Sequence, residues 1–460
     1  MSLIKSIAGL RGTVGGKVGE TLTPIDVAKF TAGFGMWIKE THDQPKVVIG
    51  RDARPSGVIF TAIVENTLRA QGIDVVDLGL STTPTVEMAV VNEKAQGGII
   101  LTASHNPSGW NALKLLNENG EFITAADGQK VLAWADSPDL LFMDPKKFGT
   151  VETKDDYIDW HIEQILKLDL VDVEAIREKG FKVVVDGVNS TGGIAVPKLL
   201  RKLGVEVTEL FCEPNGIFPH NPEPLPENIT QICNEITSGD FDLGFVVDPD
   251  VDRLVMVCED GVPFGEEYTL VSIADYVLGK KSGNTVSNLS STRALQDVTE
   301  KHGNTYKAAA VGEVNVVTAM KETNAVIGGE GNGGVILPEL HYGRDALVGI
   351  ALFLSHLAEF GKSTSMLRAT YPSYHISKNK IELDANLDLD SVLENLQLKY
   401  AKNKFSTIDG LKIEFDNEWV HLRKSNTEPI IRIYAESDSQ STADHLAQKL
   451  MMDIKELISA

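Results

Sequence analysis

The chain alternates between two spacings of hydrophobic residues, and this alternation repeats. Three times, a β-branched run that predicts a buried strand ends in polar turn residues and is followed by the apolar spacing of a helix. The three openings read KVVIGRDARPSG at 46–57, KVVVDGVNSTGG at 182–193 and NTVSNLSSTRAL at 284–295. Serine or threonine in each turn is expected to cap the helix. A glycine should end each helix before a second strand, at Gly72, Gly204 and Gly303.

A strand–loop–strand segment completes each repeat, at 97–116, 241–257 and 324–337. Strands that alternate with helices predict parallel α/β layers, and three copies predict three related α/β domains. A polar loop follows the same strand in each copy, and ligand sites in open α/β sheets lie at the carboxyl ends of strands. We therefore expect the three loops to face one shared cleft.

From about residue 371 the pattern changes. A short helical stretch and a final amphipathic helix, with Leu446, Leu450, Ile454 and Leu457 on one face, accompany several short strands. These strands are expected at 378–384, 411–415, 418–423 and 429–437. They predict a small α+β domain with its own core.

The expected fold class is α/β: three related α/β domains with mixed sheets and a smaller C-terminal α+β domain, arranged around a central cleft. A length of 460 residues suits roughly four domains of ~100–150 residues. The expected domain ranges are 1–150, 151–255, 256–370 and 371–460.

Charge and composition narrow the class of partner. With 43 basic and 65 acidic residues, the formal net charge is −22, which argues against nucleic acid or an anionic membrane. Three scattered cysteines form no CxxC pair, and neither a signal peptide nor a membrane span is evident. We expect a cytoplasmic protein that binds a small molecule, and an anionic substrate would need a locally positive pocket.

The first loop with candidate chemistry is DPDVDR, at 248–253. Asp248, Asp250 and Asp252 lie close together between apolar runs, and a divalent metal such as Mg²⁺ would relieve their repulsion. An EF-hand would also place Glu259 correctly, but Arg253 occupies the glycine that it requires. A phosphatase with an aspartate nucleophile and a solvated acidic turn are the alternatives. Arg253 beside a metal cluster suits an anion.

The second loop is TASHNP, at 102–107. Ser104 is its only evident nucleophile, His105 is adjacent, and Lys114 follows after a turn and a short strand. A serine facing a metal-binding loop suggests covalent phosphoryl transfer. The alternative is a plain turn built by Ser104, Asn106 and Pro107.

Two further loops offer ligand-binding groups. GGEGNGG at 328–334 matches GxGxxG, but Pro338 follows where a dinucleotide-binding helix should open, so Glu330 and Asn332 are candidate sugar contacts instead. The alternative is a glycine-rich hairpin. RKSNTEP, at 423–429, is a candidate phosphate cradle or an exposed turn. Its candidate groups are Arg423, Ser425, Asn426 and Thr427, and a weaker anion candidate is Arg11 in GLRGTVG.

With these four loops in this order, the whole chain resembles the α-D-phosphohexomutase family. The resemblance implies interconversion of 1-phospho and 6-phospho sugars through a phosphoserine, Mg²⁺ and a sugar 1,6-bisphosphate. It implies a phosphoserine at Ser104, which would also contact the metal, and an Mg²⁺ site on Asp248, Asp250 and Asp252. It places Arg253 and Arg11 near the phosphate, Lys114 in proton transfer, and the cradle at 423–429 on the non-transferring phosphate.

The sugar loop departs from the family pattern. Many members carry Glu-x-Ser-Gly-His, whereas here the loop reads Glu330-Gly331-Asn332-Gly333-Gly334. The favoured substrate is glucosamine phosphate, and a phosphomannomutase or phosphoglucomutase is the first alternative. A non-catalytic sugar-phosphate-binding protein and a metal-dependent phosphatase are further alternatives. A monomer or a homodimer is expected.

Overall fold

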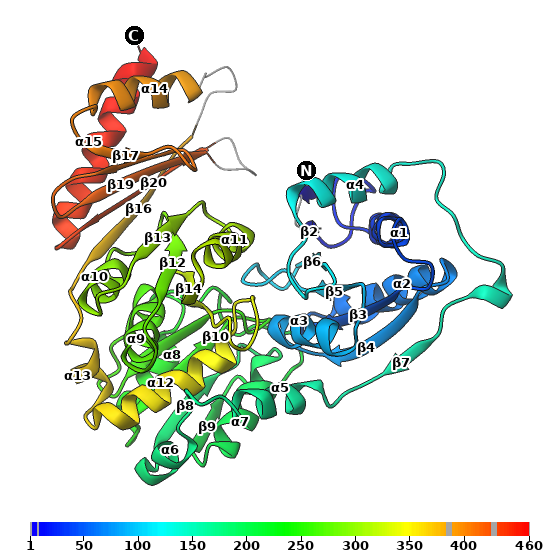
Figure 1. Cartoon of the computed structure of the whole chain (residues 1–460), viewed down its shortest axis with the longest axis horizontal. Helices are drawn as coiled ribbons and strands as arrows, with labels where there is room; N and C mark the ends of the chain where they lie inside the picture. The colour runs from blue at the N-terminus through cyan, green and yellow to red at the C-terminus, as the bar shows by residue number, and fades with distance from the viewer. Residues whose placement is uncertain (1, 7–8, 383–388, 425–429, 460) are drawn as a thin grey trace.

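A computed structural model describes residues 2–6, 9–382, 389–424 and 430–459 of the chain. Figure 1 shows an N-terminal α/β unit beside two further α/β units, with the C-terminal unit extending from the third. Their sheets have seven, four, four and five strands in chain order. This arrangement confirms the predicted fold class.

The three repeats share one sheet topology. Their strands run in the orders β6-β5-β3-β4, β11-β10-β8-β9 and β15-β14-β12-β13, with the first strand of each order antiparallel to its parallel neighbours. The strands are β3 Lys46–Arg51, β4 Asp74–Leu80, β5 Gly97–Leu101, β6 Trp110–Leu116, β8 Lys182–Asp186, β9 Glu206–Leu210, β10 Leu243–Val247, β11 Leu254–Cys258, β12 Asn284–Asn288, β13 Tyr306–Ala309, β14 Ala325–Glu330 and β15 Gly334–Ile336.

The first sheet is wider because three more strands extend it. These are β1 Ile4–Ser6, β2 Gly9–Thr13 and β7 Val151–Thr153. Strand β2 pairs antiparallel with β6, so that Arg11 lies opposite Ala112 and Gly9 opposite Lys114. A side chain at Gly9 would meet the backbone oxygen of Leu113 at 2.0 Å, so only glycine fits there. This register places Arg11 and Lys114 on the same face of the sheet.

Helices cover both faces of these sheets. They are α1 Pro24–Lys39, α2 Ser56–Ala70, α3 Thr83–Asn92, α4 Ala125–Ala135, the 3₁₀ helix η1 Pro145–Lys147, α5 Tyr157–Ile165, α6 Val173–Lys179, α7 Gly192–Lys202, α8 Thr230–Ser238, α9 Glu266–Lys280, α10 Ala294–Lys301, α11 Glu313–Thr323, α12 Ala346–Phe360 and α13 Thr364–Arg368. Among the described residues, no helix has the length and apolar character needed to cross a membrane.

The predicted helix ends are confirmed, but the predicted serine or threonine caps at the three helix starts are wrong. Gly72, Gly204 and Gly303 follow α2, α7 and α10 with φ of +78°, +79° and +73°, a conformation that glycine adopts without strain. None of these three helices has a side-chain cap hydrogen bond at its start. The hydroxyls of Ser190 and Thr191 donate instead to the carbonyl of Pro249, at 2.7 and 2.9 Å, because this tertiary acceptor lies within reach.

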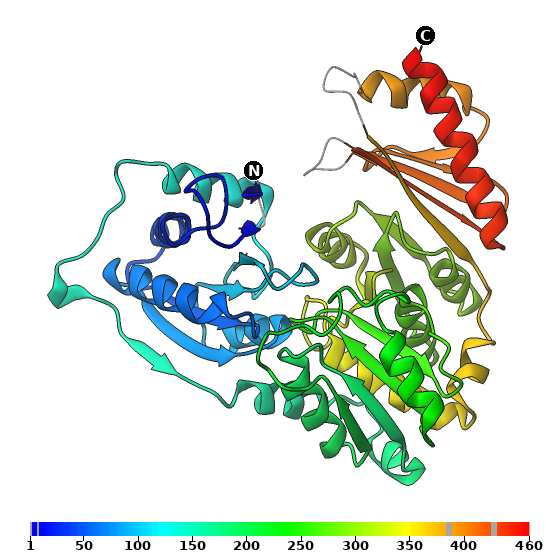
Figure 2. The same ribbon diagram turned by 180° about the vertical axis from the view of Figure 1, so that it is seen from behind.

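The C-terminal unit is an antiparallel sheet covered on one face by helices, as Figure 2 shows. Its strand order is β16-β20-β19-β18-β17. Leu446, Leu450 and Ile454 are buried in a core of its own, and Leu457 packs against that core. Its elements are β16 His375–Glu382, α14 Leu389–Lys399, β17 Lys404–Ser406, β18 Leu411–Glu414, β19 Trp419–Lys424, β20 Ile430–Ser437 and α15 Gln440–Ser459.

The second and third repeats share a continuous hydrophobic core. Helix α12 is buried along nearly its whole length and packs between them. Phe353 on this helix makes an edge-to-face contact with Phe245 of β10, at 6.2 Å between ring centroids. The second and third repeats share this core, while the first repeat has a core of its own. The close packing therefore fixes the loops of the second and third repeats relative to each other.

Candidate active site

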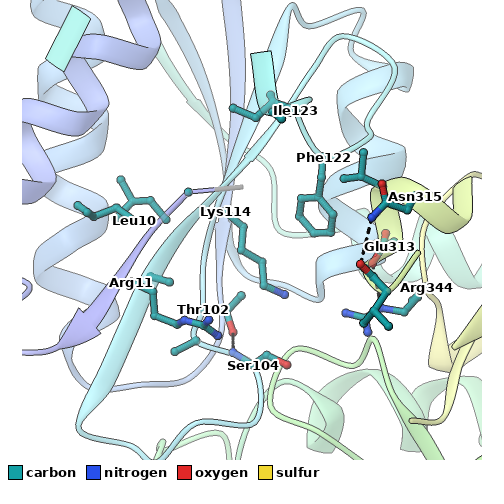
Figure 3. A pocket seen from close by; sticks show the side chains of 18 of the residues that line it. Leu10, Arg11, Thr102, Ser104, Lys114, Phe122, Ile123, Glu313, Asn315 and Arg344 are labelled. Atoms are coloured by element: carbon teal, nitrogen blue, oxygen red, sulfur yellow. Dashed lines mark hydrogen bonds and ion pairs between the residues drawn. The ribbon is translucent and has the colours of Figure 1, made fainter. Parts of the chain in front are cut away.

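A cavity of about 500 Å³ lies where the loops of the first and third repeats meet. Figure 3 shows side chains from β2, the loop after β5, β6 and the start of α11 converging on it. Four residues predicted from the sequence line this cavity, namely Arg11, Ser104, Lys114 and Glu330. The remaining lining includes Glu313, Asn315 and Arg344.

Ser104 is held in an uncommon backbone conformation, with φ of +47°. The buried guanidinium of Arg54 donates to the carbonyls of Ser104 and Asn106, at 2.5 and 2.6 Å. Arg54 is fixed in turn by Asp52, at 2.9 Å, and the Thr102 hydroxyl donates to the same carboxylate at 2.7 Å. Strain of this kind persists only where surrounding contacts over-determine it, so the loop is built to present the hydroxyl.

That hydroxyl reaches the aspartate loop of the second repeat. Ser104 Oγ donates to Asp248 Oδ2 at 2.7 Å, and Asp248 Oδ1 accepts from the backbone N–H groups of Asp252 and Arg253, both at 3.1 Å. Val251 has φ of +63°, which turns the loop back on itself. The nucleophile candidate and the metal-ligand candidates predicted from separate segments therefore lie together.

The other two aspartates each keep one oxygen without a hydrogen-bond partner. Asp250 Oδ2 accepts from Thr83 Oγ1 at 2.6 Å and from Lys114 Nζ at 2.7 Å, and Asp252 Oδ2 accepts from Arg344 at 2.7 Å. Their Oδ1 atoms are buried and have no hydrogen-bond partner among the described residues. Ligand atoms of the three aspartates lie within 4.8 Å of one another, so this donor set fits a divalent cation with oxygen ligands, such as Mg²⁺.

The electrostatics are those of crowded buried charges. Burial and the carboxylates of Asp252 and Asp250 raise the pKa of Asp248 well above its usual range. Burial also opposes ionisation of Asp250, but Lys114 and Thr83 hold the pKa of Asp250 below its usual range. Burial alone would lower the pKa of Lys114, yet the two carboxylates that it touches raise it. A bound cation would relieve the repulsion that raises the pKa of Asp248.

Positive groups crowd the other side of Ser104. Burial and then the charge of Arg253 lower the pKa of Arg11, and both guanidiniums act on His105. His105 Nδ1 lies 3.4 Å from Ser104 Oγ, and burial followed by Arg253 lowers the pKa of His105 to about 2, so its ring is neutral. Both guanidiniums act on the residue next to Ser104, and a phosphate bound there would relieve their repulsion.

Of the two sugar-loop candidates, one lines the cavity and the other does not. Glu330 lines the cavity, with Oε1 accepting from Asn288 at 2.8 Å and Oε2 accepting from Arg344 at 2.8 Å. Asn332 does not line it; its Oδ1 accepts from the backbone of Gly334 at 3.3 Å and shapes the turn.

Of the phosphate-cradle candidates, Arg423 alone lies among the described residues. Arg423, near the end of β19, lies 3.0 Å from Asp409 Oδ2 and does not line the cavity. Ser425, Asn426 and Thr427 lie outside the described residues.

Sequence reasoning missed Arg344, which bridges three carboxylates of the site. The only local signal is a charged pair, Arg344-Asp345, directly before the strongly apolar stretch that forms α12. Thr83 was missed as well, because it lies at a helix start where polar residues are ordinary.

Family models account for almost the whole chain. The models describe phosphoglucomutase/phosphomannomutase: alpha/beta/alpha domain I at 4–140, domain II at 156–261, domain III at 265–374 and the C-terminal domain at 379–452. The fold and the match define an enzyme of the phosphosugar mutase class. The chain belongs to the phosphoglucomutase/phosphomannomutase family, the α-D-phosphohexomutases.

Relatives over the full length carry several names. A phosphoglucomutase/phosphomannomutase of Thermococcus kodakarensis is 36% identical, with 94% of this chain and 96% of the relative covered. A probable phosphoglucosamine mutase of Methanopyrus kandleri is 33% identical, with 96% of each covered. A solved phosphoglucomutase/phosphomannomutase family protein of Burkholderia thailandensis has a TM-score of 0.86 at 26% identity, covering 98% of this chain and 97% of that one. The family is shared, and the names of the sugars differ.

Proposed function

We propose that this chain is an Mg²⁺-dependent mutase that interconverts glucosamine 1-phosphate and glucosamine 6-phosphate through a phosphoserine and a 1,6-bisphosphate. One observation carries the proposal. Ser104 Oγ lies on Asp248, while Asp250 and Asp252 each direct one carboxylate oxygen without a hydrogen-bond partner into the same buried space. Phosphoglucomutase/phosphomannomutase activity on glucose or mannose phosphates is the alternative.

In this proposal Asp248, Asp250 and Asp252 hold the metal together with the phosphoryl group on Ser104. When bound, Mg²⁺ supplies Lewis-acid stabilisation of the negative charge on the phosphoryl oxygens. Arg253 and Arg11 bind those oxygens from the other side, as their neighbourhood of Ser104 supports.

The first half-reaction transfers the phosphoryl group from Ser104 to a sugar hydroxyl. The Oγ–P bond breaks, the sugar O–P bond forms, and the hydroxyl proton passes to a base. The bisphosphate then turns over in the cavity and gives its other phosphoryl group to Ser104 Oγ, which returns a monophosphate sugar.

Two side chains are candidates for the proton transfers, and they differ in protonation. His105 is neutral and lies 3.4 Å from Ser104 Oγ, but burial and the nearby guanidiniums make it a weak base, so it can accept a proton only when the charge of a bound phosphate offsets them. Lys114 carries its proton, held by Asp250 and Asp252, so it can donate one or stabilise an alkoxide. Microscopic reversibility requires both functions, because the mutase works in both directions.

Glu330 and Asn332 are proposed to bind the sugar, and residues 423–429 to hold the non-transferring phosphate. The ion pair between Arg423 and Asp409 would have to exchange for a phosphate, which requires a shift of the C-terminal unit toward the cavity. The names of full-length relatives support glucosamine but also glucose and mannose, and so do not choose among them.

The test is kcat/KM on the α-1-phosphates of glucosamine, glucose and mannose, each with Mg²⁺ and the matching 1,6-bisphosphate. Strong preference for glucosamine is expected. Mass spectrometry should find a phosphoryl group on Ser104, and Ser104→Ala should lose it together with turnover. Comparable rates on glucose and mannose would establish the alternative. Release of free phosphate without bisphosphate stimulation would identify a phosphatase and overturn the proposal.

A further inference from the structure

Arg344 joins three segments of the site through one guanidinium. It donates to Asp252 Oδ2 at 2.7 Å, to Glu330 Oε2 at 2.8 Å and to Glu313 Oε2 at 2.9 Å. Asp252 lies in the loop between β10 and β11, Glu330 at the end of β14 and Glu313 at the start of α11. Each nitrogen of the fork therefore serves a different segment, a geometry that a lysine ammonium does not reproduce.

The backbone of Arg344 is fixed by its neighbour. Asp345 N–H donates to the carbonyl of Val335 on β15 at 2.8 Å, and Asp345 Oδ1 accepts from the N–H of Leu347 at 2.8 Å, which caps α12. The Arg344 side chain is only 10% exposed. It is thus fixed at its backbone by the contacts of Asp345 and at its guanidinium by the three carboxylates.

The path of the Arg344 stem depends on a glycine. A Cβ placed on Gly334 would lie 2.3 Å from Arg344 Cδ, so no side chain at 334 can coexist with the observed position of Arg344. Gly334 is one of the two positions, with Asn332, at which the sugar loop departs from the Glu-x-Ser-Gly-His pattern, and it replaces the histidine. The absence of a side chain there is what lets Arg344 pass beneath the loop and reach Asp252.

These contacts leave one oxygen of Asp252 to a ligand and fix the whole carboxylate of Glu330. Arg344 holds Asp252 Oδ2, and Asp252 Oδ1 has no hydrogen-bond partner among the described residues. Arg344 also holds Glu330 Oε2, while Asn288 and the N–H of Gly312 hold Oε1. Partners of this kind orient metal ligands, and their loss typically costs about 10–100-fold in metal affinity or activity.

We infer that Arg344 is a positioning residue that orients the metal ligand Asp252 and the sugar-loop residue Glu330 together. Metal affinity and sugar-phosphate affinity then depend on the same side chain, and linkage makes any coupling between the two ligands reciprocal. The inference rests on the proposed function for the nature of its two ligands.

The test uses direct binding rather than turnover. Calorimetry should give the Kd of Mn²⁺, as an oxygen-binding substitute for Mg²⁺, and the Kd of glucosamine 6-phosphate with and without Mn²⁺. In Arg344→Lys both constants should rise about 10-fold or more. Gly334→Ala, whose backbone suits alanine, should raise both in the same direction because the new methyl group displaces the Arg344 stem.

Matched controls separate the effect on metal binding from the effect on sugar-phosphate binding. Thr83→Val removes a partner of Asp250 only and should weaken Mn²⁺ binding alone, whereas Asn288→Ala removes a partner of Glu330 and should weaken the sugar phosphate alone. A shift of only one constant, or of neither, in Arg344→Lys would overturn the inference. A second variant, Arg344→Ala, tests for a merely structural role. If it lost affinity for Mn²⁺ and for the sugar phosphate equally, and its melting temperature fell and was not restored by 1 mM guanidinium, the inference would also be overturned. If wild-type protein binds Mn²⁺ but no hexose phosphate, the proposed function fails, and the Mn²⁺ constants still decide the role of Arg344 at Asp252.

Discussion

Two clusters among the described residues have the side chains of a metal site, and the partners of their atoms make only one of them a candidate binding site. Asp248, Asp250 and Asp252 form the first, and His161, His341 and Asp345 form the second. In the second, His161 Nε2 lies 2.9 Å from Asp345 Oδ2 and His341 Nε2 lies 3.3 Å from it.

The partners of the carboxylate oxygens distinguish the two clusters. Both oxygens of Asp345 are occupied, one by the two imidazoles and the other by the N–H groups that begin α12. The second cluster also links α3 to α5, because Thr85 Oγ1 lies 2.9 Å from His161 Nδ1. The second cluster therefore joins α3, α5 and the start of α12.

The ring atom of the second cluster that has no hydrogen bond in the described part of the chain, His341 Nδ1, faces the Glu87 carboxylate at 3.4 Å. The first cluster instead leaves one oxygen each of Asp250 and Asp252 without a hydrogen-bond partner among the described residues, and a cation would satisfy both.

The largest effect should come from Asp248→Asn. Loss of this carboxylate weakens the metal site and changes the partner of Ser104 Oγ, so kcat/KM should fall by about 10²–10³-fold, while the melting temperature is unchanged or higher because the burial penalty and the repulsion that raise the pKa of Asp248 are gone. Steady-state kinetics and thermal unfolding on the same sample check both. Loss of stability comparable to the loss of activity would contradict the contrast between the clusters.

His161→Leu should lower stability and leave activity nearly unchanged. It leaves Asp345 with one imidazole and Thr85 with Thr82 as its remaining side-chain partner, so the free energy of unfolding should fall by about 2–3 kcal/mol. Activity per folded molecule should stay within twofold, because His161 does not line the cavity. Urea denaturation and active-site titration measure the two quantities, and an inactive but stable variant would refute this assignment.

Stability should also fall as the pH rises through the range where His341 titrates. Burial alone would lower the pKa of His341, but the neighbouring carboxylates of Asp345 and Glu87 raise it to about 10. The folded protein therefore holds a proton that the unfolded chain releases near pH 6.5, and stability present below that pH is lost toward pH 10, by at most about 1.4 kcal/mol per pH unit. Denaturation curves at pH 8 and 10 should show a smaller loss in His341→Gln than in wild type; equal slopes would exclude His341 as the cause.

The smallest expected effect is that of metal on thermal stability. A ligand that binds only the folded state raises the melting temperature, by about 2 °C for each kcal/mol in domains of this size. Mg²⁺ at millimolar concentration should raise it in wild type and in His161→Leu, but not in Asp252→Asn, and EDTA should reverse the rise. A rise retained in Asp252→Asn would place the cation elsewhere.

Local pattern was enough to predict the three repeats and the main chemistry. DPDVDR has its carboxylates two residues apart, so a single loop brings them together whatever surrounds it, and Ser104 occupies the equivalent loop of a repeat that the strand pattern reveals. The positions of Asn332 and Arg423 were not accessible in this way. Whether a loop side chain turns into a cavity or hydrogen-bonds its own turn depends on neighbours that the loop sequence does not name.

The sequence by itself determined the strands, the helices and the family, because hydrophobic periodicity and turn chemistry act over a few neighbouring residues. Tertiary structure alone decided which groups meet. Ser104 reaches Asp248 across 144 positions, and Arg344 reaches Asp252 across 92. Contacts at such separations depend on how the repeats pack against one another, and the glycine that gives Arg344 its path is explained only once both segments are folded.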